Sequence, residues 1–320
     1  MIRQSITKPG IILPLKNPPL QAVRHVIRRI ASLPIPTNAK IVVDGSIPSI
    51  GEKIQVLSSE NDLPYLYASG NKHVAIDIGI QELRHRAKID AVIVLDDDSL
   101  IDARWVVIAT KLLARHDIVW GFGVCKERDY VGGFVNIDLN VMVALLAREY
   151  WLESGVYAFR LDAYLNVGGF NQTAARALSD DHALVVRFAR KGRTLDINPA
   201  LHHRLLNHRG LKDWFKQKIR WMGEILFISR RNIFLSLISL LLAFCSPLLM
   251  WKASKITRLS FPARTYFTAP AAFAAYTIAL LIAYRRIIRS GGIDWKDQKY
   301  QYNLQKKYKV LSNLRKSSIT

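Results

Sequence analysis

Short apolar runs alternate with helical patterns between residues 10 and 120, and this alternation limits the fold more than any other feature of the chain. Residues 10–15 (GIILPL), 40–43 (KIVV), 91–95 (AVIVL) and 117–123 (DIVWGFG) are typical of buried strands. Helices are expected at 21–33, where apolar residues recur at helical spacing, at 72–87 and at 102–115. Strands and helices in this order predict an α/β domain with a mostly parallel sheet covered on both faces.

Three consecutive aspartates, Asp96, Asp97 and Asp98, follow the third of these strands, and Asp44 follows the second. Ligands of such sheets bind beyond the carboxyl ends of the strands, so these side chains lie where a site is expected. Adjacent carboxylates repel one another unless a cation neutralises them, and Mg²⁺ binds one or two carboxylates together with phosphate oxygens. The alternative is a solvated acidic turn that leads into the next helix, with Asp98 or Ser99 as its N-cap.

A second acidic pair, Asp180 and Asp181, opens the helical run 183–192 (ALVVRFARKG). Acidic residues at the start of a helix commonly interact with its dipole, which is the structural interpretation of this pair. Placed in the same cleft as the first aspartates, one of the two could instead accept a proton from an attacking hydroxyl.

Apolar and aromatic residues recur at helical spacing between residues 210 and 228, and Gln217, Arg220 and Trp221 lie within this stretch. A basic, aromatic and amphipathic helix just before a long apolar run is typical of an anchor at the membrane surface. Arg220 can equally present its planar guanidinium to a diphosphate, and Trp221 can offer a flat apolar wall to an acceptor.

Two runs of 20 residues without a charge, 232–251 and 265–284, lie in the C-terminal third. About 20 apolar residues are needed to cross a bilayer core of roughly 30 Å. Residues 201–320 also carry 22 Lys and Arg against 4 Asp and Glu, so they hold most of the net charge of +21. We expect two membrane crossings, with an in-plane or re-entrant hairpin and a pair of buried core helices as the alternatives.

Other classes of protein fit the sequence less well. Cys125 and Cys245 are far apart and offer neither zinc spacing nor a disulfide framework, which indicates a reducing cytosol. The chain has no glycine pattern of the dinucleotide-binding or P-loop type. The first ten residues are too polar for a signal sequence, so the globular part is expected to stay on the cytoplasmic side. A nucleic-acid partner is not expected, because the acidic clusters would repel phosphate without a metal.

The order of the short motifs resembles that of the family 2 inverting glycosyltransferases over roughly residues 8–300. The motifs are Asp44, Asp96-x-Asp98, Gly168-Gly169-Phe170, Asp180-Asp181 and Gln217-x-x-Arg220-Trp221. Within that family the chain looks most like the branch of ceramide glucosyltransferases and of carotenoid or diacylglycerol glycosyltransferases. The tail from Gly291 to Tyr300 is similar to a motif that is common in this branch.

The resemblance implies a GT-A fold and a role for each matching residue. Asp44 would contact the base or ribose of a nucleotide-sugar, Lys72 would lie near the donor, and Asp96 would approach the ribose or sugar. Asp98 would bind the divalent cation, Mg²⁺ or Mn²⁺, whereas Asp97 is expected to point away. Asp181 would be the general base beside Asp180, and Gln217, Arg220 and Trp221 would close over the diphosphate and acceptor. Asp77 stands where the family has Asn, Asp180 where it has Glu, and a single Asp44 where it has two aspartates, so the donor contacts are expected to differ.

These features together predict a membrane-bound enzyme that moves a hexose from a UDP-glucose-like donor to a lipid hydroxyl. Its parts would be a cytoplasmic catalytic domain (1–208), an interfacial helix (209–231), a membrane hairpin (232–285) and a basic cytoplasmic tail (286–320). A polyprenyl-phosphate sugar transferase and a polysaccharide synthase subunit are the enzyme alternatives. The alternative from another class is a basic membrane-binding scaffold without activity.

Overall fold

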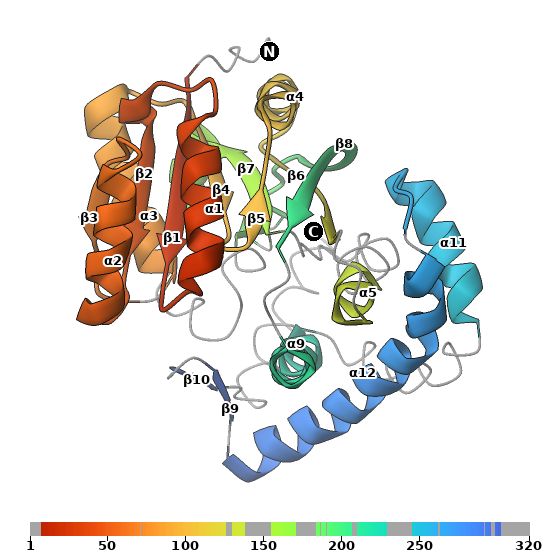
Figure 1. Ribbon diagram of the computed structural model, residues 1–320. Coiled ribbons are helices and arrows are strands. Elements are labelled where there is room, and N and C mark those ends of the chain that lie inside the picture. The colour runs from red at the N-terminus through yellow and green to blue at the C-terminus, as the bar shows by residue number, and fades with distance from the viewer. Residues whose placement is uncertain are drawn as a thin grey trace.

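The computed structural model describes residues 8–70, 72–125, 130–137, 155–170, 184–185, 187–189, 191–206, 210–228, 245–261, 263–290, 292–295 and 298–301. Its centre is an eight-stranded sheet in the order β3-β2-β1-β4-β7-β6-β8-β5, with helices packed around it (Figure 1). A separate two-stranded sheet pairs β9 (Gly292–Trp295) with β10 (Gln298–Gln301).

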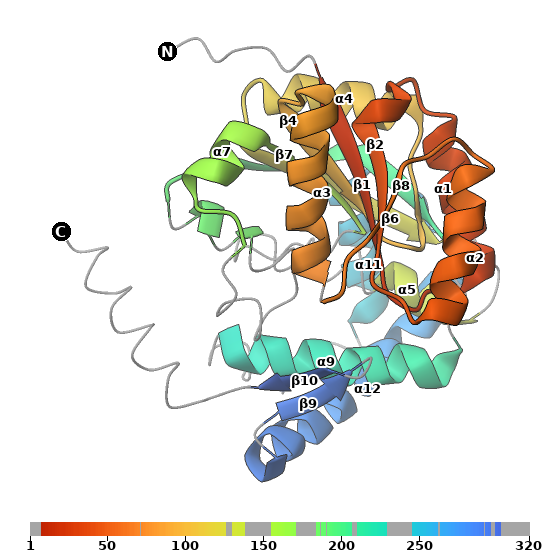
Figure 2. The same ribbon diagram turned by 90° about the vertical axis from the view of Figure 1, so that its left-hand side faces the viewer.

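The first half of the chain forms strands and helices in alternation, as the sequence predicts. Its elements are β1 (Pro9–Leu15), α1 (Leu20–Ala31), a short 3-10 helix (Thr37–Ala39), β2 (Lys40–Asp44), α2 (Pro48–Ser59), β3 (Tyr65–Tyr67), α3 (Lys72–Ala87) and β4 (Ala91–Leu95). The four strands run parallel, and β2 and β4 are buried along their whole length. Strand β4 is apolar throughout, as is typical of a buried parallel strand, whereas β2 buries the charged residues Lys40 and Asp44 at its two ends. Helix α3 covers one face of this part of the sheet, and α1 and α2 cover the other (Figure 2).

The second half of the sheet is mixed, which corrects the expectation of a mostly parallel sheet. Its elements are β5 (Ser99–Leu100), α4 (Ala103–Leu113), β6 (Ile118–Cys125), α5 (Tyr130–Asn136), β7 (Val156–Arg160), α7 (Leu161–Asn166) and β8 (Leu195–Leu205). Strand β7 enters between β4 and β6 and runs antiparallel to both, and β5 runs antiparallel to β8. The difference arises because the chain does not return after β6 through a simple strand–helix–strand crossover.

The C-terminal helices form a second apolar core beside the sheet. They are α9 (Leu211–Ile228), α11 (Ser246–Thr257) and α12 (Ala263–Ser290). Trp214 and Met222 of α9 are buried together with Phe273 and Tyr276 of α12, and α12 also contacts α5 and α11. Helix α9 is therefore packed against protein along its apolar side.

The two apolar runs, 232–251 and 265–284, are described by the structure to different extents. Among the described residues, Thr265–Ser290 of α12 is the one stretch of helix long and apolar enough to cross a bilayer, and half of its apolar window is buried inside the protein. Residues 232–244 of the first run lie outside the described residues, and its remainder belongs to α11, which begins at Ser246. Within the described residues there is thus one candidate crossing, and the first of the two predicted crossings lies largely outside them.

The pairing of β6 with β8 tolerates no side chain at Gly121. A Cβ there would lie 1.4 Å from the carbonyl oxygen of Leu201, where the register of the two strands shifts. We expect Gly121→Ala to lower the free energy of unfolding by about 3 kcal/mol or more, measured by urea denaturation, because the backbone of β8 has to move. Gly210→Ala is the matched control, since a Cβ at Gly210 would meet nothing within 4 Å. Equal stabilities of the two variants would contradict this close packing.

Candidate active site

The carboxyl edge of the parallel strands gathers the first group of predicted site residues. Lys72 is the first residue of α3, and its Nζ lies 2.5 Å from Oδ1 of Asp96, directly after β4. Both side chains are partly exposed, so the pair lies at the surface of the sheet edge. The ammonium group compensates Asp96, and the carboxyl groups of Asp97 and Asp98 follow it in the same turn.

Asp44 lies at the same edge but is fully buried. Its carboxylate accepts hydrogen bonds from the backbone N–H of Ser46 at 3.0 Å and from the hydroxyl of Tyr65 at 3.1 Å. Burial and the nearby Asp44 raise the pKa of Tyr65 to about 12, so this hydroxyl remains a donor at physiological pH. Asp44 therefore holds the loop after β2 through these two hydrogen bonds.

Asp44 and Asp96 lie on either side of β1. Leu15 of β1 pairs with Asp44, and Ile12 of the same strand pairs with Val94 of β4. Neighbouring strands are about 4.8 Å apart, which places the backbones of β2 and β4 roughly 10 Å apart at this edge. The structure thus brings Lys72 and Asp96 into contact and leaves Asp44 one strand further away.

Backbone hydrogen bonds fix the turn that carries the three aspartates. The N–H of Asp96 donates to the carbonyl of Gly155 at 2.7 Å, and the N–H of Leu206 donates to the carbonyl of Asp98 at 2.8 Å. The N-cap of α4 is Asp102, whose side chain accepts from the N–H of Trp105 at 2.8 Å. The interpretation of Asp98 or Ser99 as the cap of this helix is therefore wrong, and the triplet is left without that structural role.

The surroundings of Asp98 fit a hard divalent cation shared with phosphate oxygens. Asp96, Asp97 and Asp98 are all half-buried, so exposure does not single out Asp97 as the residue that points away. Within the described part of the chain, no three His, Cys, Asp or Glu side chains are grouped so that they could hold a metal by themselves. A Mg²⁺ or Mn²⁺ ion needs only one or two carboxylates when a diphosphate supplies further oxygens, and Asp98 beside the paired Asp96 meets that need.

Helix α9 carries the second group of predicted residues. It begins five residues after Leu206, the residue bonded to Asp98, and its residues Gln217, Arg220 and Trp221 are all half-buried. Lys218 is completely buried, and its Nζ lies 2.8 Å from the centroid of the Trp221 ring. One face of the Trp221 ring is therefore covered by the Lys218 side chain. The role of Trp221 as an apolar wall for an acceptor stays a prediction.

The turn at residues 168–170 contacts α3 and precedes the predicted catalytic pair along the chain. Gly168 and Gly169 have φ angles of +83° and +58°, which favour glycine, and the N–H of Phe170 donates to the hydroxyl of Tyr164 at 3.1 Å. That hydroxyl donates in turn to Asp77 of α3. The same helix thus positions Lys72 beside Asp96 and, through Asp77 and Tyr164, the 168–170 turn.

Asp180 and Asp181 lie outside the described residues, so their roles stay predictions. The sequence reading missed Tyr164 and also Arg187, whose guanidinium donates to the carbonyl of Gly169. The sequence held one sign of Tyr164, because Asp77 stands where the family has Asn. A buried carboxylate at that position favours a nearby hydrogen-bond donor, and the hydroxyl of Tyr164 is that donor.

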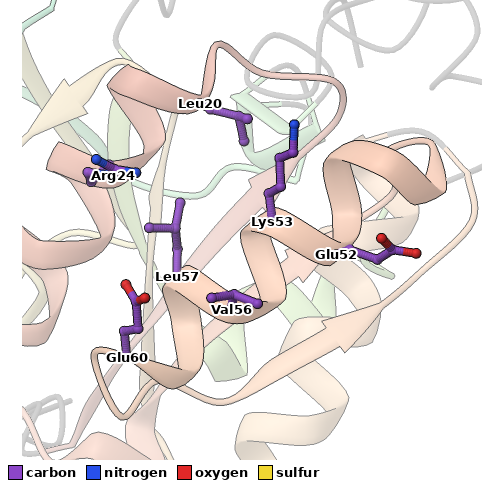
Figure 3. A pocket seen from close by; sticks show the side chains of 7 residues that line it. All are labelled: Leu20, Arg24, Glu52, Lys53, Val56, Leu57 and Glu60. Carbon is purple, nitrogen blue, oxygen red and sulfur yellow. The ribbon is translucent and has the colours of Figure 1, made fainter.

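A separate surface cavity of about 400 Å³ lies between α1 and α2 (Figure 3). Its lining side chains are Leu20, Arg24, Glu52, Lys53, Val56, Leu57 and Glu60. None of these is a predicted site residue, and they come from the outer surfaces of two helices rather than from the strand ends. We therefore place the site at the sheet edge and not in this cavity.

The environment of Asp77 gives a pH-dependent prediction. Burial is the largest influence on this carboxyl and raises its pKa, so the folded protein loses stability as the pH rises from about 4 through that raised value. Asp77→Asn keeps an acceptor for Tyr164 but cannot ionise. We expect it to raise the free energy of unfolding at pH 7 and to have a smaller effect at pH 4.5, measured by urea denaturation.

Asp162→Asn is the control, because ionisation of this carboxyl has the opposite effect on the free energy of unfolding. The hydrogen bond from Arg160 lowers the pKa of Asp162, so ionisation of this carboxyl stabilises the fold above its unfolded pKa. This variant is expected to lose stability at pH 7 and to keep most of that loss at pH 4.5. An effect of Asp77→Asn that does not change with pH would contradict the raised pKa.

Comparisons with known proteins identify the family of the chain. The model of glycosyl transferase family group 2 matches residues 91–287, which include the three aspartates, the 168–170 turn and most of α12. The mannosyltransferase PcManGT from Pyrobaculum calidifontis, solved in complex with GDP-Man and Mn²⁺, has a TM-score of 0.50 and 16% identity, over 98% of this chain and 81% of its own. TarS 1–349 of S. aureus has a TM-score of 0.47 and 13% identity, over 93% and 97% of the two chains.

No curated protein sequence matches the chain. The family model covers more than half of the residues, and the PcManGT likeness supports the expected GT-A fold with a mixed sheet. The chain therefore belongs to family group 2 of the glycosyltransferases and is a transferase enzyme.

Proposed function

We propose that this glycosyltransferase is a membrane-associated, inverting enzyme that transfers a hexose from a nucleotide-diphosphate sugar, with UDP-glucose as the expected donor, to the hydroxyl of a lipid. The observation that carries the proposal is the Lys72–Asp96 ion pair beside the half-buried Asp98 at the carboxyl edge of the sheet. A cation and a set of carboxylates at this edge suit a ligand that has both a diphosphate and sugar hydroxyls.

The donor would extend along the edge from β2 to β4. Lys72 and Asp96 are only partly buried, so both can exchange some of their mutual contact for contacts with the donor. The loop held by Asp44 would support the nucleoside end. Arg220, on the helix that follows Leu206, would offer its guanidinium to the diphosphate.

Asp98 would hold the divalent cation, Mg²⁺ or Mn²⁺. When bound, such an ion offsets the negative charge that builds up on the leaving diphosphate. The presence of Mn²⁺ and GDP-Man in PcManGT supports a cation-dependent donor site, although that likeness concerns the fold.

The acceptor would be activated by Asp181, with Asp180 as its acidic neighbour. Asp181 would take the proton of the acceptor hydroxyl while its oxygen attacks the anomeric carbon from the face opposite the diphosphate, so the configuration inverts. General-base catalysis of this kind typically contributes about 10²- to 10⁴-fold to the rate. The 168–170 turn, held by Tyr164 and Arg187, would fix the start of the segment that carries this base.

A lipid acceptor is supported by the apolar C-terminal helices and by the motif resemblance to the ceramide, carotenoid and diacylglycerol branch. A processive polysaccharide synthase needs a bundle of spans to enclose a channel, whereas one candidate span is found among the described residues. Polyprenyl-phosphate sugar transfer is disfavoured by the Gln217-x-x-Arg220-Trp221 motif. Membership of an enzyme family sets aside the non-catalytic scaffold.

Asp98→Ala tests the cation site. We expect this variant to lose the Mn²⁺-dependent part of UDP binding, because the metal would lose its protein ligand, while the folded protein remains stable. Titration calorimetry with UDP, with and without Mn²⁺, measures the effect, and Asp97→Ala serves as the neighbouring control. Retained Mn²⁺-stimulated binding in Asp98→Ala would refute the assignment.

Asp181→Asn tests the base. The variant keeps the size of the side chain but cannot accept the proton, so we expect kcat to fall by about 10²-fold or more with little change in donor affinity. Membranes that contain the protein, supplied with labelled nucleotide-sugars and analysed by mass spectrometry of the labelled lipid, provide the assay and identify donor and acceptor. Full activity of Asp181→Asn would require another base.

A further inference from the structure

Helix α12 has a buried side and an apolar outer side. Its inner residues, among them Ala269, Phe273, Tyr276 and Ala283, are buried against the rest of the protein. Its outer side nevertheless exposes large apolar residues at helical spacing, with exposed fractions from 53% to 83%: Phe267, Ile278, Leu281 and Ile288. An apolar stripe of this length on the outside of a protein indicates a surface that is covered in its working state.

The centre of α12 is fastened to the catalytic domain. Tyr276, at its midpoint, lies 6.2 Å from Trp214 of α9, measured between ring centroids. Closer to its start, Thr268 approaches α5 so closely that a Cβ at Gly133 would lie 2.7 Å from its Oγ1. Figure 1 shows α12 running along one edge of the molecule, with α9 and α5 on its inner side.

This attachment conflicts with a simple membrane crossing. If α12 crossed the bilayer, its midpoint and the part of α9 around Trp214 would lie near the bilayer centre. The exposed charged residues Lys212, Asp213 and Lys216 flank Trp214 on α9, and they would enter the hydrocarbon, where charged side chains are strongly disfavoured. With α12 lying flat on the membrane, the outer stripe meets lipid and α9 stays on the aqueous side.

Helix α11 contacts α12 and also exposes large apolar residues. They are Leu248, Trp251 and Ile256, of which Leu248 and Trp251 are three residues apart on one side of the helix. Lys252 and Lys255 are exposed beside them, and Nζ of Lys255 lies 5.8 Å from the centroid of the Trp251 ring. A tryptophan and lysines around an apolar face are typical of a helix that lies in the membrane interface.

The net positive charge of α11 and α12 favours a membrane with anionic lipids. Residues 246–290 contain seven Lys and Arg and no Asp or Glu. Six of the basic residues are exposed on α11 and α12 or at their ends: Lys252, Lys255, Arg258, Arg285, Arg286 and Arg289. Such a segment is attracted to the anionic lipids of a cytoplasmic leaflet.

We propose that the outer faces of α11 and α12 form an in-plane docking surface for an anionic lipid bilayer, with α12 lying parallel to the membrane instead of crossing it. We call this set of residues, Leu248, Trp251, Ile256, Phe267, Ile278, Leu281 and Ile288, the docking face. The proposal deepens the membrane part of the proposed function, but it does not require the acceptor to be a lipid.

Depth measurements distinguish the two orientations of α12. Fluorescent labels would be attached to single cysteines introduced by Phe267→Cys, Ile278→Cys or Ile288→Cys in the full chain, after exposed Cys245 is replaced by serine. Residues 267 and 288 are about 32 Å apart along the helix, close to the thickness of the hydrocarbon core. Quenching by lipids brominated at different depths should place all three labels at one shallow depth. A label at 278 much deeper than the other two would overturn the proposal.

Charge substitutions test the surface itself. The double change Ile278→Asp and Leu281→Asp should reduce binding to phosphatidylglycerol-containing vesicles at least tenfold in a flotation assay. The matched control is the double change Val56→Asp and Val107→Asp, which alters equally exposed valines on α2 and α4 and should bind normally. Equal binding of both variants, or equal wild-type binding to neutral vesicles, would refute the proposal.

Two further measurements separate this inference from the proposed function and from self-association. UDP binding measured without lipid should be unchanged in the docking-face variant, so a failure of membrane docking leaves the donor site intact. Sedimentation of the wild type in dilute detergent should show a monomer. A dimer that the docking-face substitutions dissociate would assign the surface to a second copy of the chain and overturn the lipid assignment.

Discussion

The ion pair between Lys72 and Asp96 is the contact on which the arrangement of the site depends. It joins the first residue of α3 to the end of β4 and compensates one of three adjacent carboxylates. Without a nearby cation, the three aspartates would repel one another at the point where the strand ends. The backbone of the same turn is also fixed from the other side, because the N–H of Leu206, directly after β8, donates to the carbonyl of Asp98.

Helix α3 connects this ion pair to the 168–170 turn. Five residues after Lys72, Asp77 accepts the hydrogen bond from Tyr164, and Tyr164 in turn holds the N–H of Phe170. The edge of His73 packs against the same phenylalanine, with ring centroids 4.8 Å apart. Helix α3 therefore sets the position of Asp96 and of the 168–170 turn. In the proposed function, these are the parts that would support the donor site and the segment with Asp180 and Asp181.

The C-terminal helices combine a packing role with an interfacial one. Small residues of α12 allow it to approach α9 and α5 closely, and this contact buries Trp214 and supports the helix that carries Gln217 and Arg220. The opposite side of α12 stays apolar. In the proposed function, the diphosphate-binding helix would thus rest directly on the element that meets lipid, which would bring a lipid hydroxyl to the site without extracting the lipid from the membrane.

The sequence by itself determined the alternation of strands and helices in the first half of the chain, because unbroken apolar runs and helical spacing are local patterns. It also determined that Asp44 and Asp96 to Asp98 follow strands that end at one edge, and that the motifs match the glycosyltransferase family. Contacts between distant segments were decided only by the tertiary structure. These include the antiparallel insertion of β7, the cap at Asp102, the Tyr164–Asp77 bond and the burial of one side of α12. An apolar run of 20 residues has the same hydropathy whether lipid surrounds it or one of its sides packs on protein. The reason is that hydropathy depends on composition and not on the neighbouring residues in the fold.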